Sequence, residues 1–328
     1  MTLPLVKLFL LGGTITMKPA PNTAAIIPTL AADDLCRAVP GLDQLARLVT
    51  RTDHMLASGN LTIRHAVDLA GEIKQAAEAG KTDGFVIVQG TDTLEEMAFL
   101  LDCLLDIAQP VVVTGAMRSP AAQSCDGPAN ILAAVTCAAN KSIGLAGVVV
   151  VMNDDIHGAQ FVTKSHTGNV AAFQSPNIGP IGRVVEGRAH LLAIPVQGPK
   201  ISLAPCKNIP RVALIKALFD DDAFQLAMLE NADCQGAVIE AFGAGHLPEA
   251  YLPSLDILIG KMPVILSSRV GAGHIFQQTY GYKGAEVDLI QRGLIPAGLL
   301  DGPKSRLLLI LLLMSGADHA DIKQAFSA

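Results

Sequence analysis

The chain has 328 residues, with 24 basic and 30 acidic side chains for a net charge of −6. Half of its residues are hydrophobic and 16% are charged, which excludes a disordered chain and indicates a globular protein with large cores. No block of lysines and arginines occurs, so we expect no nucleic-acid partner. The longest apolar run, residues 307–314, falls far short of the roughly 20 residues of a membrane helix, and we expect a helix buried in a core or a subunit interface there.

Short β-rich runs without polar alternation recur through the first half of the chain. They are "VKLFLLGGT", "GFVIVQGTD", "PVVVTGAMR" and "AGVVVVMNDD", and helix-like segments such as "AVDLAGEIKQAAEA" separate them. Such runs are typical of strands that are covered on both faces. They predict an α/β protein whose larger N-terminal domain has a parallel, flavodoxin-like sheet.

A proline-rich stretch of low periodicity interrupts this pattern, and similar strands resume beyond it in "RVALIKALF", "GAVIEAFGAG" and "MPVILSSR". We therefore expect an N-terminal domain at residues 1–193, a linker at 194–210 and a smaller C-terminal α/β domain at 211–328.

Two of the predicted strands end in a Gly-Thr turn. Thr14 follows Gly12 and Gly13, and Thr91 with Asp92 follows Gly90. Taken alone, each turn is either an ordinary strand end, or a place where glycines let a substrate approach the backbone beside a nucleophilic hydroxyl. Because ligands bind beyond the carboxyl ends of parallel strands, these residues and Arg118 are expected to share one rim of the sheet.

Two further residues extend this prediction. Thr93 and Glu96 fit a capping box that opens a helix carrying Met97, Leu100 and Leu101. Lys164 is an ordinary solvated lysine on its own, but beside Asp92 and away from water it could exchange protons or be held charged by the carboxylate.

The six cysteines are scattered, without a C-x-x-C pair or a histidine partner at zinc spacing, and are expected to be small core residues in a reducing compartment. The N-terminus lacks a basic segment and a cleavage site of small residues. Both observations favour a cytoplasmic protein.

Five segments in a fixed order resemble the bacterial-type L-asparaginase family, which includes glutaminases. They span nearly the whole chain and are "LGGTIT", "VIVQGTDTLEEMAFLLD", "PVVVTGAMRSP", "VVVVMNDDIHGAQFVTKSHTGNVAAFQSPNIGPIG" and "SSRV" with "GAEVDL". The resemblance implies an enzyme that hydrolyses the side-chain amide of L-asparagine to L-aspartate and ammonia. Asparagine and glutamine differ by one methylene, so a broad glutaminase-asparaginase is an alternative.

The resemblance assigns catalytic roles by position. Thr14 attacks the amide carbon to form an acyl-enzyme, and Thr91, Asp92 and Lys164 form a second group in which Lys164 passes protons to and from Thr91. Thr91 is the alternative first nucleophile. The backbone N–H groups of the two Gly-Thr turns are the expected oxyanion donors, and no metal or organic cofactor is implied.

Substrate binding is implied for Ser58, Asn60, Asp92 and Glu286. Ser58 would bind the α-carboxylate and Asp92 the ammonium, with Glu286 arriving from a neighbouring subunit. A homotetramer, built as a dimer of dimers with shared sites, is therefore expected.

This chain departs from the family in several places. Ser58-Gly59-Asn60 replaces a Ser-Gln or Ser-Glu pair, and His246 stands where relatives often carry Asn, as either a structural residue or a ligand. Many relatives also have a tyrosine on the loop after the first Gly-Gly-Thr, and residues 17–30 contain none. We expect a tyrosine supplied in trans to replace it, with Tyr280 preferred over Tyr282.

Three other functions fit the sequence less well. The related subunit of an archaeal-type tRNA-dependent amidotransferase carries an extra N-terminal domain, whereas this chain begins with the strand. A non-catalytic amino-acid sensor on the same fold would need neither Thr14 nor Lys164. An unrelated serine hydrolase would carry a G-x-S-x-G elbow, which the sequence lacks.

Overall fold

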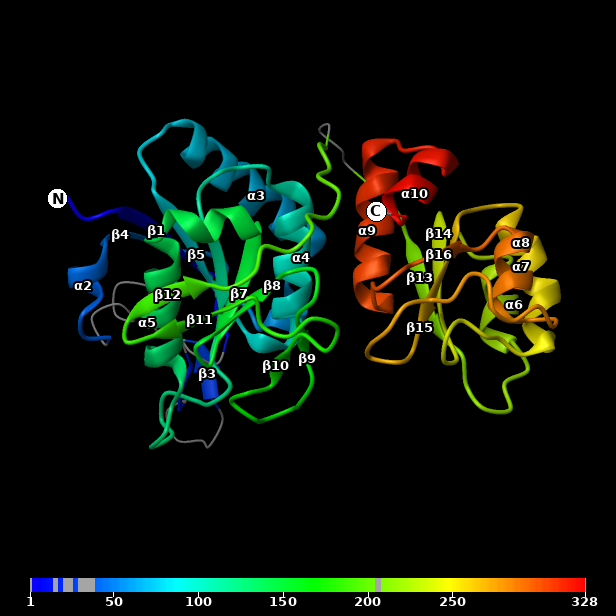
Figure 1. Ribbon diagram of the computed structural model, residues 1–328, viewed down its shortest axis with the longest axis horizontal. Helices are drawn as coiled ribbons and strands as arrows, with labels where there is room; N and C mark the ends of the chain where they lie inside the picture. Colours follow the sequence, from blue (N-terminus) through cyan, green and yellow to red (C-terminus); the bar gives the residue numbers. More distant parts are fainter. Residues whose placement is uncertain (1, 14–16, 20–25, 29–38, 204–207, 328) are drawn as a thin grey trace. The chain divides into compact units, whose positions relative to one another are not determined.

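The computed structural model describes residues 2–13, 17–19, 26–28, 39–203 and 208–327. The backbone divides into two compact units, residues 1–200 and 201–328 (Figure 1). Thr14, Cys36 and Cys206 lie outside the described residues.

The first unit is built on an eight-stranded sheet. Five parallel strands form one side of it, in the order β4 (Arg47–Thr52), β1 (Leu5–Leu10), β5 (Gly84–Val88), β6 (Val111–Thr114) and β7 (Val148–Met152). In chain order this is 2-1-3-4-5, the flavodoxin arrangement, whose ligand site lies where the strand order reverses, between the first and third strands. Those strands are β1 and β5, the two that precede the Gly-Thr turns.

The predicted parallel, flavodoxin-like part of the sheet is therefore confirmed, and the complete sheet is mixed. Three antiparallel strands continue it beyond β7, namely β8 (Asp155–Gly158), β11 (Gly182–Val185) and β12 (Arg188–Leu191). Tight turns cause two of these reversals, because Asn153 and Asp154 between β7 and β8 both have positive φ, as do Glu186 and Gly187 between β11 and β12. Two consecutive positive φ values define the hairpin turn that matches strand twist.

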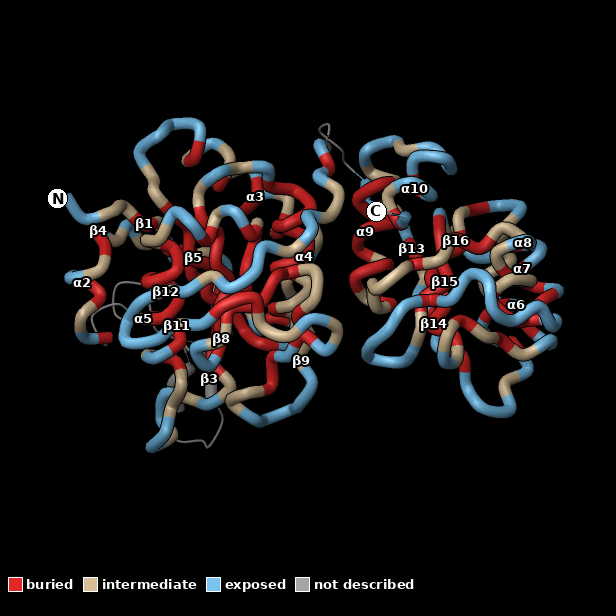
Figure 2. The backbone as a smooth tube through the Cα atoms, in the orientation of Figure 1, coloured by how far each residue is buried: buried red, intermediate tan, exposed pale blue. Residues whose placement is uncertain are grey.

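Helices cover both faces of this sheet. α5 (Gly127–Ala138) lies on one side, and α3 (Ile63–Glu78) and α4 (Leu94–Leu104) lie on the other (Figure 1). The strands between them are buried, as Figure 2 shows, and β5, β6 and β7 are buried at every residue. This double cover explains why their sequences show no polar alternation.

Shorter elements complete the first unit. They are α2 (Leu42–Leu45), the hairpins β2 (Met17–Pro19) with β3 (Ile26–Pro28) and β9 (Thr163–Lys164) with β10 (Phe173–Gln174), and the 3₁₀ turns Ser58–Asn60, Thr91–Thr93 and Lys141–Ala146.

The second unit has a four-stranded parallel sheet in the order β13 (Val212–Lys216), β14 (Gly236–Ala241), β15 (Val264–Ser268) and β16 (Ile295–Pro296). Figure 1 shows α9 (Gly302–Ser315) and α10 (His319–Ala325) on one side of it. The other side carries α6 (Phe224–Leu229), α7 (Leu252–Ile259), α8 (Glu286–Arg292) and the 3₁₀ turn Glu249–Tyr251.

The apolar run near the C-terminus forms a helix, as predicted. It lies in α9, where Leu307 to Leu312 are all buried. No helix in the described part of the chain is both long and apolar enough to span a membrane.

Candidate functional site

The turns that follow β1 and β5 lie directly against each other. Gly13 has φ +91°, and a Cβ on it would lie 2.1 Å from the backbone nitrogen of Gly90. A Cβ on Gly12 would lie 2.5 Å from the carbonyl oxygen of Leu56, which follows β4. The glycines therefore let the chain segments that follow β1, β4 and β5 pack backbone to backbone.

Ser58 lies beside the second of these turns. It is 3% exposed, and a Cβ on Gly90 would come within 2.8 Å of its Oγ. The Thr93 hydroxyl donates to the Ser58 carbonyl at 2.9 Å, and Thr93 makes no side-chain cap bond to the helix that it precedes. The predicted helix is confirmed, but the predicted capping bond is wrong, because the Thr93 hydroxyl bonds the Ser58 carbonyl instead.

The Lys164 ammonium joins the two polar residues that follow β5. Nζ donates to Thr91 Oγ1 at 2.9 Å and to Asp92 Oδ1 at 2.7 Å. Lys164 and Thr91 are largely covered, whereas the Asp92 side chain is 78% exposed. Because the ammonium is the donor, the proton of the Thr91 hydroxyl can point elsewhere, and the exposed carboxylate can meet a cation from solvent.

Glu95 links the same helix start to the strand that carries Lys164. Its carboxylate accepts from the backbone N–H of Lys164 and from the Thr163 hydroxyl, the latter at 3.3 Å. Glu95 was not predicted from the sequence. A signal existed, since Glu95 stands in the first turn of the helix that begins directly after Thr91 and Asp92.

Two other residues of the predicted rim are at its periphery. Asn60 is exposed in the 3₁₀ turn that starts at Ser58. Arg118 follows β6 as expected, but its guanidinium bonds Ser124 at Oγ and at the carbonyl and so closes its own loop.

The second unit gathers four candidate side chains of its own. Glu286 begins α8 with 0% exposure, and its carboxylate accepts from the backbone N–H groups of Thr279 at 2.9 Å and Tyr280 at 2.7 Å. His246 Nε2 lies 3.2 Å from Glu286 Oε2. The His246 ring meets those of Tyr280 and Tyr282 edge-on, with centroids 5.1 and 5.6 Å away.

The charge on Glu286 is favoured within this cluster. Burial would raise the pKa of its carboxyl, but the N–H groups of Tyr280, Glu286 and Thr279 and the nearby His246 outweigh burial and lower the pKa. The pairing of His246 with Glu286 was not anticipated from the sequence, because the residues are 40 positions apart.

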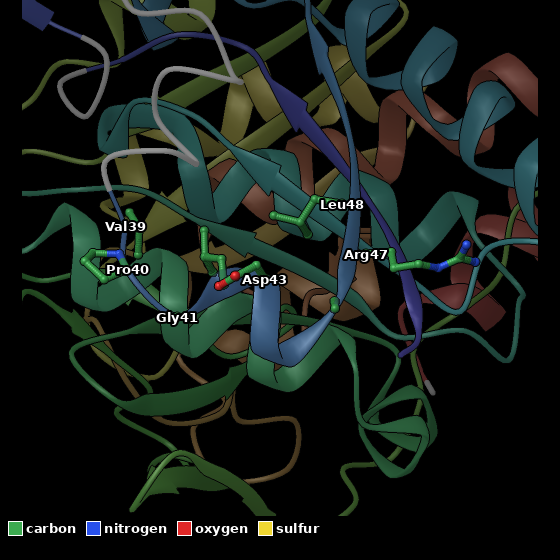
Figure 3. A pocket seen from close by; sticks show the side chains of 8 residues that line it. Val39, Pro40, Gly41, Asp43, Arg47 and Leu48 are labelled. Carbon is green, nitrogen blue, oxygen red and sulfur yellow. The ribbon is translucent and has the colours of Figure 1, made fainter. Parts of the chain in front are cut away.

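An open pocket of about 640 Å³ lies elsewhere in the first unit, around α2 (Figure 3). Its described lining runs from Val39 to Leu48, with Asp43 and Arg47 as the charged side chains, and includes none of the candidate residues. Within the described residues, no three His, Cys, Asp or Glu side chains are grouped as metal ligands.

A family model described as "Asparaginase, N-terminal" matches residues 5–197, more than half of the chain. The chain belongs to the asparaginase family. A second model, "Glutaminase/Asparaginase C-terminal domain", matches residues 211–326. The two family models therefore cover both units.

Relatives of nearly equal length agree with this membership. The chain is 37% identical to "Probable L-asparaginase" of Deinococcus radiodurans over 330 residues, covering 99% of this chain and 98% of that protein. It is 34% identical to "Probable L-asparaginase periplasmic" of Haemophilus influenzae, covering 99% and 93%. It is 30% identical to "Glutaminase-asparaginase" of Pseudomonas aeruginosa, covering 96% and 88%.

Proposed function

We propose that the protein is an L-asparaginase, an amidohydrolase that converts L-asparagine to L-aspartate and ammonia. Membership of the asparaginase family and relatives named L-asparaginase support this function. The observation that carries it is the Lys164 ammonium bonded to both Thr91 Oγ1 and Asp92 Oδ1 at the switch point of the sheet.

The proposed reaction has two steps. The Thr14 hydroxyl oxygen bonds to the amide carbon, the C–N bond breaks, and the leaving nitrogen takes a proton to depart as ammonia. Water then hydrolyses the ester and frees aspartate. Thr91 gives its hydroxyl proton to the leaving nitrogen and is reprotonated by Lys164, and the proton that Thr14 loses restores the charge on Lys164. Backbone N–H groups of the Gly-Thr turns stabilise the oxyanion.

Recognition of the substrate follows from the same rim. Asp92 is proposed to bind the α-ammonium, since its carboxylate is exposed, and Ser58 with Asn60 to bind the α-carboxylate. Glu286 and Tyr280 are proposed to serve the site of a neighbouring subunit in a homotetramer, with Tyr280 as the helper of the nucleophile. Light scattering at micromolar concentration tests the assembly, and a fully active monomer contradicts it.

The direct test is ammonia release by the purified protein from L-asparagine, L-glutamine and their D-forms. L-Asparagine is expected to be the best substrate, and Thr14→Ala is expected to abolish the reaction. A protein that binds these amino acids without releasing ammonia is instead a sensor on this fold.

A broad glutaminase-asparaginase is the second candidate. The similarity to the Pseudomonas protein of that name favours it. Comparable kcat/KM values for L-glutamine and L-asparagine would establish it.

We also propose a cytoplasmic location, from the cysteine usage. The name of the Haemophilus relative places that protein in the periplasm. Cell fractionation distinguishes the two compartments.

A further inference from the structure

Lys164 needs an anchor that its own strand does not supply. β9 is two residues long, and among the described strands it pairs with β10 alone, in a sheet separate from the eight-stranded one. The Lys164 side chain is long and flexible, while its two hydrogen bonds need the ammonium placed to within a fraction of an ångström. Something must fix the main chain of Lys164 relative to Thr91.

Glu95, on α4, supplies such an anchor for the main chain of Lys164. It lies in the first turn of α4, the helix that begins directly after Thr91, Asp92 and Thr93. Its carboxylate accepts from the Lys164 backbone N–H and from the Thr163 hydroxyl, so it bonds both residues of β9. One helix start thus holds Thr91 and Asp92 through its backbone and Lys164 through a side chain.

The contacts argue against a purely electrostatic role. The ion pair recorded for the Lys164 ammonium is with Asp92, whereas Glu95 bonds the main chain of Lys164. An acidic residue in a first helical turn also favours the helix dipole, but Glu96 supplies the same charge one position later. The dipole alone therefore does not require a carboxylate that reaches β9.

We propose that Glu95 is a positioning residue, which fixes the Lys164 main chain so that the ammonium reaches Thr91 and Asp92 together. This inference rests on the proposed function only for its effect on turnover. Its structural content, that Glu95 holds β9 against α4, stands independently.

Three variants separate the effect of the length of the Glu95 side chain from the effect of its charge. Glu95→Gln keeps the length and an oxygen that accepts from the Lys164 N–H, Glu95→Asp keeps the charge but is one methylene shorter, and Glu95→Ala removes both. Glu96→Gln is the matched control, because it removes the same charge from the same turn. We expect kcat for L-asparagine to fall about 10²-fold or more in Glu95→Ala and Glu95→Asp, with KM changed less than about 3-fold.

Glu95→Gln and Glu96→Gln are expected to stay within about 10-fold of the wild-type kcat. If Glu95→Gln is as impaired as Glu95→Ala while Glu95→Asp is active, charge matters and positioning is wrong. If Glu95→Ala keeps the wild-type kcat, the proposal also fails.

Hydrogen exchange measured by mass spectrometry gives a readout besides activity. In a peptide spanning residues 161–168, exchange should be about 10-fold faster in Glu95→Ala than in wild type and unchanged in Glu96→Gln. Equal exchange in all variants would overturn the proposal even if wild type hydrolyses no amide. Conversely, suppose that the wild type releases no ammonia and that residues 161–168 exchange faster in Glu95→Ala. That result would refute the proposed function and leave the positioning role of Glu95 intact.

Discussion

The two units assemble their polar side chains in different ways. In the first, the polar residues come from separate strand ends, and side-chain bonds join Lys164 to Thr91 and Thr93 to the carbonyl of Ser58. In the second, Tyr280, Tyr282 and Glu286 lie on one loop and helix start, and His246 joins them from beyond β14. The first arrangement exists only when the sheet is formed, whereas most of the second is local. Substitutions should therefore act differently in the two units.

The largest effect is expected from Lys164→Met. It removes both bonds of the ammonium and hence proton transfer through Thr91, so kcat should fall about 10³-fold or more. Asp92→Asn, in contrast, is expected mainly to raise KM, because it weakens pairing with the substrate ammonium. Kinetics of both variants across pH provide the measurement, and a Lys164→Met enzyme with normal kcat would contradict the assignment.

Substitution of two tyrosines tests the catalytic role proposed for the second unit. Replacing Tyr280 by Phe removes one hydroxyl with little loss of packing, and kcat should fall about 10²-fold if that hydroxyl helps activate the nucleophile. Tyr282→Phe is the matched control, since both rings contact His246 and both are partly exposed.

Mixed oligomers then show which subunit is served. Combining Thr14→Ala chains with Tyr280→Phe chains should restore part of the activity if the site is shared. The idea fails if neither phenylalanine variant is impaired.

Replacing one glycine in each unit by alanine compares how tightly the backbone is packed in the two units. Gly13→Ala places a Cβ against the backbone of Gly90 at positive φ, and we expect a loss of about 3 kcal/mol or more. Gly245 also has positive φ, but a Cβ there meets the Ile275, Glu286 and Leu266 side chains at 3.2 to 3.4 Å, so Gly245→Ala should cost less. Calorimetry of both variants measures the difference, and equal thermal midpoints would count against the close contact of the strand-end turns.

The smallest expected effect is the loss of folding stability in acid, which should begin in the first unit as the pH falls. His157 is 1% exposed, and burial lowers the pKa of its imidazole although Asp155 opposes this. The folded state therefore disfavours the proton, and stability is lost as pH falls below the ordinary value of 6.5, by at most about 1.4 kcal/mol per pH unit.

The carboxyls with lowered pKa behave differently and lie in the second unit. The hydrogen bond from Tyr251 lowers the pKa of Asp221. The backbone N–H groups that bond the Glu286 carboxylate lower its pKa despite burial. Their stabilisation is complete above about 4.5 and is lost only as pH falls through the folded pKa.

Hydrogen exchange at several pH values, corrected for intrinsic rates, resolves the two units. The first should loosen between about pH 6.5 and 4.5, and His157→Gln should remove that loss while Glu286→Gln leaves it in place. Simultaneous loosening of both units in this window would contradict the comparison.

The sequence predicted the parts of the fold that depend on local pattern. Uniformly apolar strands and the apolar run of α9 were recognisable because double-sided burial leaves no polar alternation. The reversal from β7 to β8 was missed, because the turn at Asn153 and Asp154 lacks the glycine that marks such hairpins.

The candidate site was predictable in part for a similar reason. Thr91, Asp92 and Lys164 were identified by motif, and the structure brings them together. Glu95 and the partnership of His246 with Glu286 were missed, because they depend on tertiary contacts between residues 69 and 40 positions apart. The use of Thr93 between strand ends, in place of the capping bond, has the same cause.

We propose that the turns that follow β1 and β5 catalyse amide hydrolysis through Thr91 and Lys164. The most direct test is ammonia release from L-asparagine by wild type and by Thr91→Val, which keeps the side-chain shape and loses the hydroxyl that Lys164 contacts. We predict rapid release by wild type and a fall in kcat of about 10³-fold in a variant with unchanged thermal stability. A Thr91→Val enzyme that keeps more than about a tenth of the wild-type kcat, which is a rise of less than about 1.4 kcal/mol in the activation free energy, would contradict this role of Thr91.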